Sequence, residues 1–225
     1  MKSNIEPLFP YTFYHIYNRG INGETIFKKE ENYAYFLQRY AFFIPPVAET
    51  YAYCLLGNHF HLLVRIRSEK EILEFANKKV TANNADRVQN PVSVNDPISK
   101  RERTVDQLIS LQFSHFFNSY AQAFNKQNDR TGGLFETPFR RKQITSESYL
   151  SQVIFYIHSN PQKHGFCDDF RDYPYSSYHA HLSSKPTKLA REEVLQSFGG
   201  EGYYRDFHKA RHDTKEIDRW AIEFD

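Results

Sequence analysis

The chain lacks the features that mark secreted, disulfide-rich and membrane proteins. Its 225 residues include only two cysteines, Cys54 and Cys167, and their spacing fits neither a metal site nor a disulfide framework. No apolar run approaches the roughly 20 residues that a membrane-spanning helix needs. Met1 to Glu6 has no apolar core of the kind found in signal peptides. We therefore expect a soluble, cytoplasmic protein without a membrane partner.

A strong net charge is also missing. The formal charge is +2 at pH 7, so a surface for nucleic acid would have to be a local basic patch. Aromatic residues, by contrast, make up 16% of the chain. Their rings can fill a hydrophobic core or stack on unpaired bases, and composition does not distinguish the two roles. The length suits one sizeable domain with additions.

The spacing of apolar residues predicts a mixture of strands and helices. Strands are expected at 11–17, 49–56 and 58–67, and within 134–144. Helices are expected at 29–44, 68–75, 104–127, 145–159 and 190–198, and in part of the tail from residue 203. We expect Asn18 to end the first strand, Thr104 to cap the longest helix and Pro161 to stop the helix that precedes it. Residues 77–100 read as a long loop.

The most informative stretch for function is a pair of histidines at the start of the third expected strand. Because side chains of a strand alternate between its two faces, His59 and His61 point the same way and Phe60 points into the opposite layer. Two imidazoles on one rigid strand form a ready pair of nitrogen ligands for a divalent metal. Two ordinary histidines on a solvated sheet face would give the same pattern, so the pair alone leaves both readings open.

A second group of polar residues lies on the helix expected before Pro161. Tyr156 and Asn160 are four residues apart and therefore share one helix face. A tyrosine oxygen and an amide oxygen on that face could both reach a metal held by the histidine pair. Such a group predicts a phosphotransfer site, with the tyrosine as nucleophile and the metal polarising the phosphate. Tyr149 is the rival nucleophile by spacing alone.

These motifs resemble those of a known family. The run Gly57-Asn58-His59-Phe60-His61-Leu62-Leu63-Val64 resembles the His-hydrophobic-His motif of single-tyrosine HUH transposases. The segment from Tyr156 to Gly165 resembles the end of the catalytic helix in REP-associated tyrosine transposases. Further matches, in the order of that family, are Tyr14 to Gly20, Arg130 to Gly132, Phe139 to Arg141 and Tyr173 to Tyr178. Together they span about residues 11–180 and form a specific set.

The resemblance implies a fold and a reaction. It implies an α+β, ferredoxin-like transposase domain over residues 1–182 and a C-terminal helical extension over 183–225. It implies His59 and His61 as ligands of Mg²⁺ or Mn²⁺, Tyr156 as the nucleophile and Asn160 as the third ligand. The reaction would be metal-dependent nicking and rejoining of single-stranded DNA through a 5′-phosphotyrosine, at hairpin-associated sequences. Two departures are Ser159 and Gln162, where relatives often carry a larger apolar residue and a valine.

The resemblance also implies DNA as the partner of a monomer or homodimer that is nucleoid-associated when bound. The predicted phosphate contacts are Arg19, Arg130, Arg140, Arg141 and Lys142. Strand alternation would place Arg140 and Lys142 on one face and Arg141 on the other.

Three alternatives from other classes remain open at the level of sequence. The chain could bind hairpin nucleic acid without cutting it. It could be a metal-dependent hydrolase with water as nucleophile, although neither motif contains the carboxylate that would serve as general base. It could also be a purely structural, aromatic-rich domain, which predicts no metal affinity.

Overall fold

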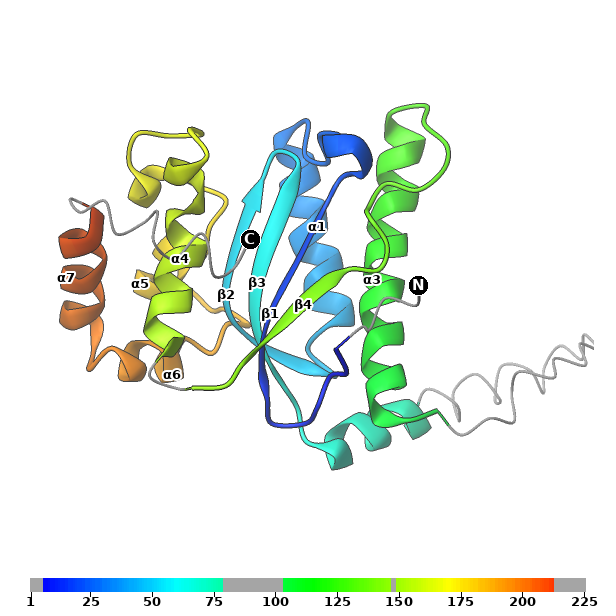
Figure 1. Cartoon of the computed structure of the whole chain (residues 1–225), viewed down its shortest axis with the longest axis horizontal. Helices are drawn as coiled ribbons and strands as arrows, with labels where there is room; N and C mark the ends of the chain where they lie inside the picture. The colour runs from blue at the N-terminus through cyan, green and yellow to red at the C-terminus, as the bar shows by residue number, and fades with distance from the viewer. Residues whose placement is uncertain (1–5, 79–102, 147–148, 213–225) are drawn as a thin grey trace, which may run out of the picture.

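The computed structural model describes residues 6–78, 103–146 and 149–212, which form a sheet between two layers of helices (Figure 1). The sheet is antiparallel and its four strands lie in the order β2-β3-β1-β4. The strands are β1 (Phe13–Arg19), β2 (Ala48–Leu56), β3 (His59–Ile66) and β4 (Arg140–Ile144). Strands β3 and β1 are therefore central, and β4 is an edge strand.

Two helices, α1 (Glu30–Phe43) and α3 (Val105–Gln127), cover one face of the sheet (Figure 1). With this strand order, the succession β1-α1-β2-β3-α3-β4 is a ferredoxin-like arrangement. The α+β fold expected from the sequence is confirmed. A short turn, η1 (Ile21–Gly23), follows β1, and residues 69–78 are helical after β3. Within the described ranges, no helix combines the length and the apolar character that crossing a membrane requires.

The start of α3 follows the sequence prediction. The Thr104 hydroxyl accepts a hydrogen bond from the backbone of Gln107, and the Gln107 side chain accepts one from the backbone of Thr104. This reciprocal pair satisfies two donors that would otherwise lack partners at the helix start. Most of the loop expected at 77–100 lies outside the described residues.

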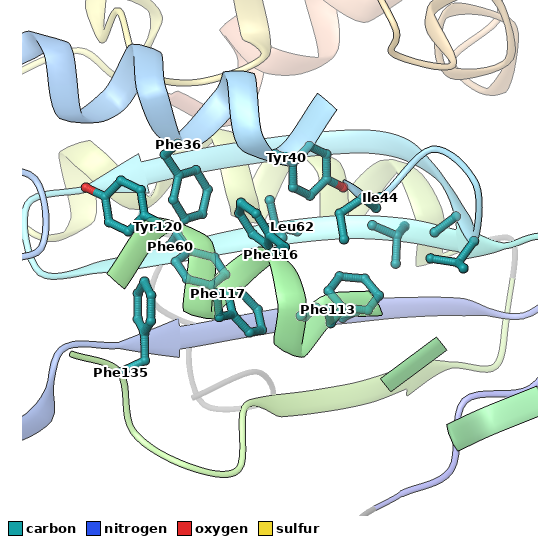
Figure 2. Packing of buried hydrophobic residues seen from close by; sticks show 14 of the residues in the cluster. Phe36, Tyr40, Ile44, Phe60, Leu62, Phe113, Phe116, Phe117, Tyr120 and Phe135 are labelled. Carbon is teal, nitrogen blue, oxygen red and sulfur yellow. The ribbon is translucent and has the colours of Figure 1, made fainter. Parts of the chain in front are cut away.

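The first hydrophobic core lies between these two helices and the sheet (Figure 2). Phe36 of α1 sits at its centre, with ring centroids 4.8 Å from Phe116 and 5.1 Å from Tyr120, both of α3. On the side of the sheet, the ring of Phe60 on β3 lies with its centroid 5.1 Å from that of Phe36. Offset and edge-on aromatic pairs of this kind add to the gain from burial alone. Many of the aromatic residues noted in the sequence are thus core residues.

The second core lies on the other face of the sheet and is built around α4 (Leu150–Lys163) (Figure 1). The remaining C-terminal elements pack with α4. They are η4 (Phe170–Asp172), α5 (Tyr178–Leu182), α6 (Arg191–Ser197) and α7 (Glu201–His212). The chain between η4 and α5 also bonds to β2, where the Leu55 N–H donates to the Tyr175 carbonyl over 3.0 Å. The part of the expected extension that is described therefore shares a core with α4.

Two predicted boundaries are wrong. The first strand runs through Asn18 to Arg19, because both residues pair with β3. Pro161 does not stop α4, which continues for two further residues although a proline cannot donate to the carbonyl of Ile157. The helix ends at Lys163 and is closed by Gly165, whose φ of 72° is in the left-handed region. There the N–H groups of residues 165 and 166 donate to the carbonyls of residues 162 and 161, a Schellman ending that favours glycine.

The second core contains a group of buried histidines. His158 of α4 bonds through Nδ1 to His208 Nε2 of α7 over 3.0 Å and through Nε2 to the Ser177 hydroxyl over 2.7 Å. Burial lowers the pKa of His181 to about 4 and that of His208 to about 3. It also holds the pKa of His158 well below its usual range. All three are therefore neutral at neutral pH.

Acid should destabilise the fold through these histidines. An unfolded histidine binds a proton below a pH of about 6.5, whereas His181 and His208 bind one only near pH 4 and pH 3 in the fold. Between these values the unfolded state holds more protons, so stability that is present above pH 6.5 is lost as the pH falls. Each histidine should remove about 2 kcal/mol of unfolding free energy between pH 7 and pH 5. Urea denaturation at both pH values measures the loss, which should be smaller in His181→Leu; an equal loss in the variant would contradict this account.

Candidate active site

The histidine pair lies on the face of the sheet that carries α4. Strand alternation directs His59 and His61 toward this face and Phe60 into the first core, as the sequence predicts. Register places Tyr17 of β1 opposite His61 and Arg19 opposite His59. The two imidazole centroids are 5.1 Å apart with nearly perpendicular planes.

Hydrogen bonds engage one nitrogen of each histidine. His59 Nδ1 lies 2.7 Å from the side-chain oxygen of Asn58, which can only accept, so this nitrogen carries the proton and Nε2 has the lone pair. His61 Nδ1 lies 2.9 Å from His15 Nε2 on the neighbouring strand. Nε2 of His61 is buried and has no hydrogen-bond partner within the described part of the chain. Burial, followed by the neighbouring His15 and His59, holds the pKa of His61 well below its usual range, which favours a neutral ring.

Helix α4 brings Tyr156 to this pair. Its ring meets His15 and His61 edge-on, with both centroid distances at 5.8 Å, and only 1% of the residue is exposed. The ammonium group of Lys163 lies 5.5 Å from the centre of the Tyr156 ring. The rival tyrosine, Tyr149, immediately precedes α4 and is 43% exposed. The sequence-predicted nucleophile is therefore the one that contacts the histidines.

Asn160 follows one turn later on the same stripe of α4. Its amide nitrogen donates to the Tyr156 carbonyl over 2.7 Å, which fixes the orientation of the side chain. Its Oδ1 is buried and finds no partner among the described residues. One further turn along, the ring of His164 lies 5.0 Å from that of His59. The helix stripe of Tyr156, Asn160 and His164 thus lies along the histidine pair, with Tyr156 against His61 and His164 against His59.

An open cavity of about 500 Å³ lies in front of the histidines. It is lined by Tyr17, Asn18, Arg19, Asn58, His59, Phe60, His61, Arg140, His164 and Phe166. Sequence reasoning assigned no role in the site to Tyr17, Asn58, His164 or Phe166. The spacing of His164 from Asn160, four residues on one helix face, was a usable signal, and so was the strand period that links Tyr17 to His15. Nothing in the sequence pattern marks Phe166.

Three of the five predicted phosphate contacts lie on the face of the histidine pair. Arg19 and Arg140 line the cavity, and both side chains are more than half exposed. They flank Glu136 and form ion pairs with it. Lys142 is exposed and lies opposite His15 in the pairing of β1 with β4. Arg19 and Arg140 thus make a basic rim at the cavity, and Lys142 lies on the same face of β4 two residues further along.

The other two predicted contacts lie elsewhere. Strand alternation turns Arg141 toward α3, as expected, where it is only 7% exposed and donates to the Ser110 hydroxyl over 2.9 Å. Arg130 forms a two-pronged ion pair with Glu24 and also donates to the Gly133 carbonyl. Their role as phosphate contacts stays a prediction, and their present partners give each a structural role.

The residues around the histidine pair can hold a metal ion only if the side-chain amide of Asn160 is one of the ligands. Among the described residues, no group of three His, Cys, Asp or Glu side chains is placed to hold a metal ion. His61 Nε2 and Asn160 Oδ1 are buried without partners among the described residues, and Asn160 Oδ1 is a donor outside that class. Buried polar atoms normally have partners, so two such atoms without one are consistent with a ligand at this place.

The chain is similar to known proteins in sequence and in fold. The chain matches no family model. It is 26% identical over 139 residues to a Haemophilus influenzae protein provisionally named a REP-associated tyrosine transposase. The match covers 61% of this chain and 62% of that protein, so the chain spans less than two thirds of its curated relative.

A solved structure shares the fold. It is a REP-associated tyrosine transposase bound to a REP hairpin, with a TM-score of 0.52 and 14% sequence identity. The superposition covers 84% of this chain and 92% of the solved one. The sequence resemblance drawn from the histidine and tyrosine motifs is thus confirmed by a curated relative and by a shared fold. The chain is thus similar in sequence to a protein provisionally named a REP-associated tyrosine transposase, and it shares its fold with a solved one.

Proposed function

We propose that this protein is a metal-dependent transesterase that nicks and rejoins single-stranded DNA at hairpin-associated sequences. The observation that carries the proposal is the packing of Tyr156 edge-on against His61 and its partner His15. The histidine pair and the basic rim lie at one cavity, and Tyr156 packs against a histidine of that pair. Together they would provide metal ligands, phosphate contacts and a nucleophile. The relative whose structure is known binds a REP hairpin, and this supports DNA of that kind as the substrate.

In the proposed reaction, the Tyr156 oxygen attacks the scissile phosphate. A bond forms between that oxygen and phosphorus, and the bond between phosphorus and the 3′ oxygen breaks. The phenol loses its proton, and the departing 3′ oxygen takes up a proton. The product is a 5′-phosphotyrosine and a free 3′ hydroxyl. That hydroxyl, or one from another strand, reverses the step and rejoins DNA, so no nucleotide cofactor is required.

The surrounding residues hold the reactants in place. Arg19, Arg140 and Lys142 bind phosphates on either side of the scissile one. The positive charge of Lys163 near the Tyr156 ring stabilises negative charge on the phenolic oxygen. Asn58 and His15 keep the rings of His59 and His61 in fixed orientations.

A divalent ion held by His59, His61 and Asn160 would polarise the scissile phosphate. Imidazole nitrogens suit later transition metals, whereas amide and water oxygens suit Mg²⁺ and Mn²⁺. Of the two ions expected from the sequence, we therefore propose Mn²⁺ as the better match for this mixed set.

A denaturing gel tests the proposal. The protein is mixed with end-labelled single-stranded DNA hairpins in Mn²⁺, in Mg²⁺ or in chelator, beside His59→Ala. We expect a covalent adduct that needs the metal, carries the label of the fragment downstream of the cut and is lost in His59→Ala. His179→Ala, which removes an exposed histidine of α5, is the matched control and should form the adduct normally.

Two other results would redirect the proposal. Hairpin binding without an adduct would favour a protein that recognises hairpins but does not cut them. Cleavage without an adduct would favour a hydrolase that uses water. If the protein neither bound nor cleaved any of the hairpins, that result would contradict the proposal outright.

A further inference from the structure

A second cavity lies beside α1, which covers the opposite face of the sheet from α4 (Figure 1). Its volume is about 460 Å³, compared with about 500 Å³ for the first cavity, in front of the histidine pair. One wall is α1, with Leu37 and Ala41, and the other is the segment of residues 186–189. The Ala190 N–H donates to the Thr50 carbonyl of β2 over 2.9 Å, so the end of that segment is fixed to the edge of the sheet. Both walls are therefore held in place by the fold itself.

The lining of the second cavity is mainly apolar, and two of its buried hydroxyls satisfy each other. The Tyr40 hydroxyl and Thr50 Oγ1 lie 2.8 Å apart, and both residues are buried. Leucine, proline and alanine side chains contribute much of the remaining surface. Such a lining offers little for the recognition of a base edge, which needs free donors and acceptors. It suits instead a bulky apolar side chain, whose transfer out of water is favourable.

The charge around the second cavity is positive. Of the described residues that line it, Lys188 alone is charged. Its ammonium group donates to the Ala41 carbonyl over 2.9 Å, which holds it against the wall on α1. Lys185, three residues earlier, is exposed as well, and neither lysine forms an ion pair within the described part of the chain. Because an ammonium group carries three donors, Lys188 keeps two of them for an acceptor from outside the chain.

A third cation without a carboxylate partner among the described residues lies across α1. Arg39 donates through Nε to the Ser119 hydroxyl of α3 over 2.8 Å. Its guanidinium lies 5.2 Å from the ring centre of Phe42 and 5.0 Å from that of Phe43. Phe42 is 68% exposed and lies between Arg39 and Ala41 around the helix. Arginine and aromatic side chains are enriched at protein–protein interfaces, which favours a protein as the partner of this surface.

We propose that the second cavity and the three cations around it bind an acidic peptide segment of a partner protein. One bulky apolar side chain of that segment fills the cavity, and carboxylates of the same segment bind Lys188 and Lys185. The peptide continues over Phe42 toward Arg39. Because α4 and the first cavity lie on the opposite face of the sheet, the partner and DNA can be bound together. The surface recruits the protein to a partner and leaves the first cavity open, and the inference does not depend on the reaction proposed above.

Selection from a library of random peptides tests the surface. The peptides are displayed on phage and selected on the immobilised full-length protein, and the most enriched one is synthesised with a fluorescent label for anisotropy titrations. We expect enriched sequences that carry several acidic residues next to a phenylalanine, tryptophan or leucine. Replacing that apolar residue with alanine should weaken binding about 10-fold. Amide NMR shifts of the full chain should place the peptide at Leu37, Ala41 and residues 186–189, and shifts confined to the first cavity would contradict the proposal.

Charge reversal tests the role of the cations. Lys188→Glu should bind the peptide more than about 10-fold more weakly, because like charges then face each other. Lys209→Glu makes the same change at an exposed lysine of α7 outside the cavity and should bind as the parent does. Equal affinities of the two variants, a selection that enriches no acidic peptide, or displacement of the peptide by single-stranded DNA would each overturn the inference. Thermal melting checks that both substitutions leave the fold intact.

Discussion

Replacing Tyr156 with phenylalanine should abolish the covalent protein–DNA adduct and leave the fold unchanged. The ring that packs 5.8 Å from the centroids of His15 and His61 is retained, so the second core keeps its shape. Only the hydroxyl that would attack phosphorus is removed. Loss of the nucleophile should lower the rate of adduct formation by more than about 10³-fold. Quantified denaturing gels measure this rate, and filter binding of the hairpin shows that affinity is retained.

Two matched variants make this result specific. Tyr149→Phe removes the exposed tyrosine in front of α4, and Tyr17→Phe removes the tyrosine that lines the first cavity. Both should form adducts. The Tyr17 variant is the sharper control, because Tyr17 borders the open cavity whereas Tyr156 is almost fully buried. An adduct that persists in Tyr156→Phe and disappears in Tyr17→Phe would assign the nucleophile to Tyr17.

The features that the sequence predicts correctly are those that depend on local periodicity. A period of two fixes the common direction of His59 and His61 and the separation of Arg140 from Arg141. A spacing of four fixes the shared stripe of Tyr156 and Asn160. The ferredoxin-like fold follows from the family resemblance together with the succession of strands and helices, and the observed strand order confirms it.

The features that the sequence did not predict depend on contacts between distant segments. The bond between His15 and His61 requires the register of β1 on β3, which no local pattern specifies. Arg130 resembles a free basic residue until Glu24, which precedes it by 106 positions, is placed beside it. Pro161 is a local stop signal, but the packing of α4 against the sheet outweighs one missing backbone hydrogen bond.

The role of the C-terminal segment shows the same dependence. By composition it has no recognisable chemistry, and it reads as an appendage to the domain. In the fold, α7 bonds to α4 through the pair of His208 and His158, two residues after Tyr156. The described part of this segment therefore supports the helix that carries the proposed nucleophile. A substitution in α7 can then alter the position of Tyr156 without any contact with DNA.

Replacing His15 should weaken metal binding although His15 is not a proposed ligand. When His15 Nε2 accepts the proton of His61 Nδ1, the lone pair of His61 resides on Nε2, the nitrogen without a partner among the described residues. In the opposite tautomer, Nε2 of His61 carries the proton and cannot bind a metal. Partners of this kind typically change metal affinity by about 10- to 100-fold. We therefore expect His15→Phe to bind Mn²⁺ about 10- to 100-fold more weakly in calorimetric titrations.

His15→Gln separates the hydrogen bond from the packing, because its amide oxygen can accept the same proton that His15 accepts. It should restore much of the affinity that His15→Phe loses. Nitrogen NMR of the metal-free protein reads the tautomer of His61 directly and does not depend on activity. We expect the proton on Nδ1 in the parent and in His15→Gln, and a mixture of tautomers in His15→Phe. A parent with the proton of His61 on Nε2 would contradict this account, because the metal would then have to displace that proton and His15 would oppose binding.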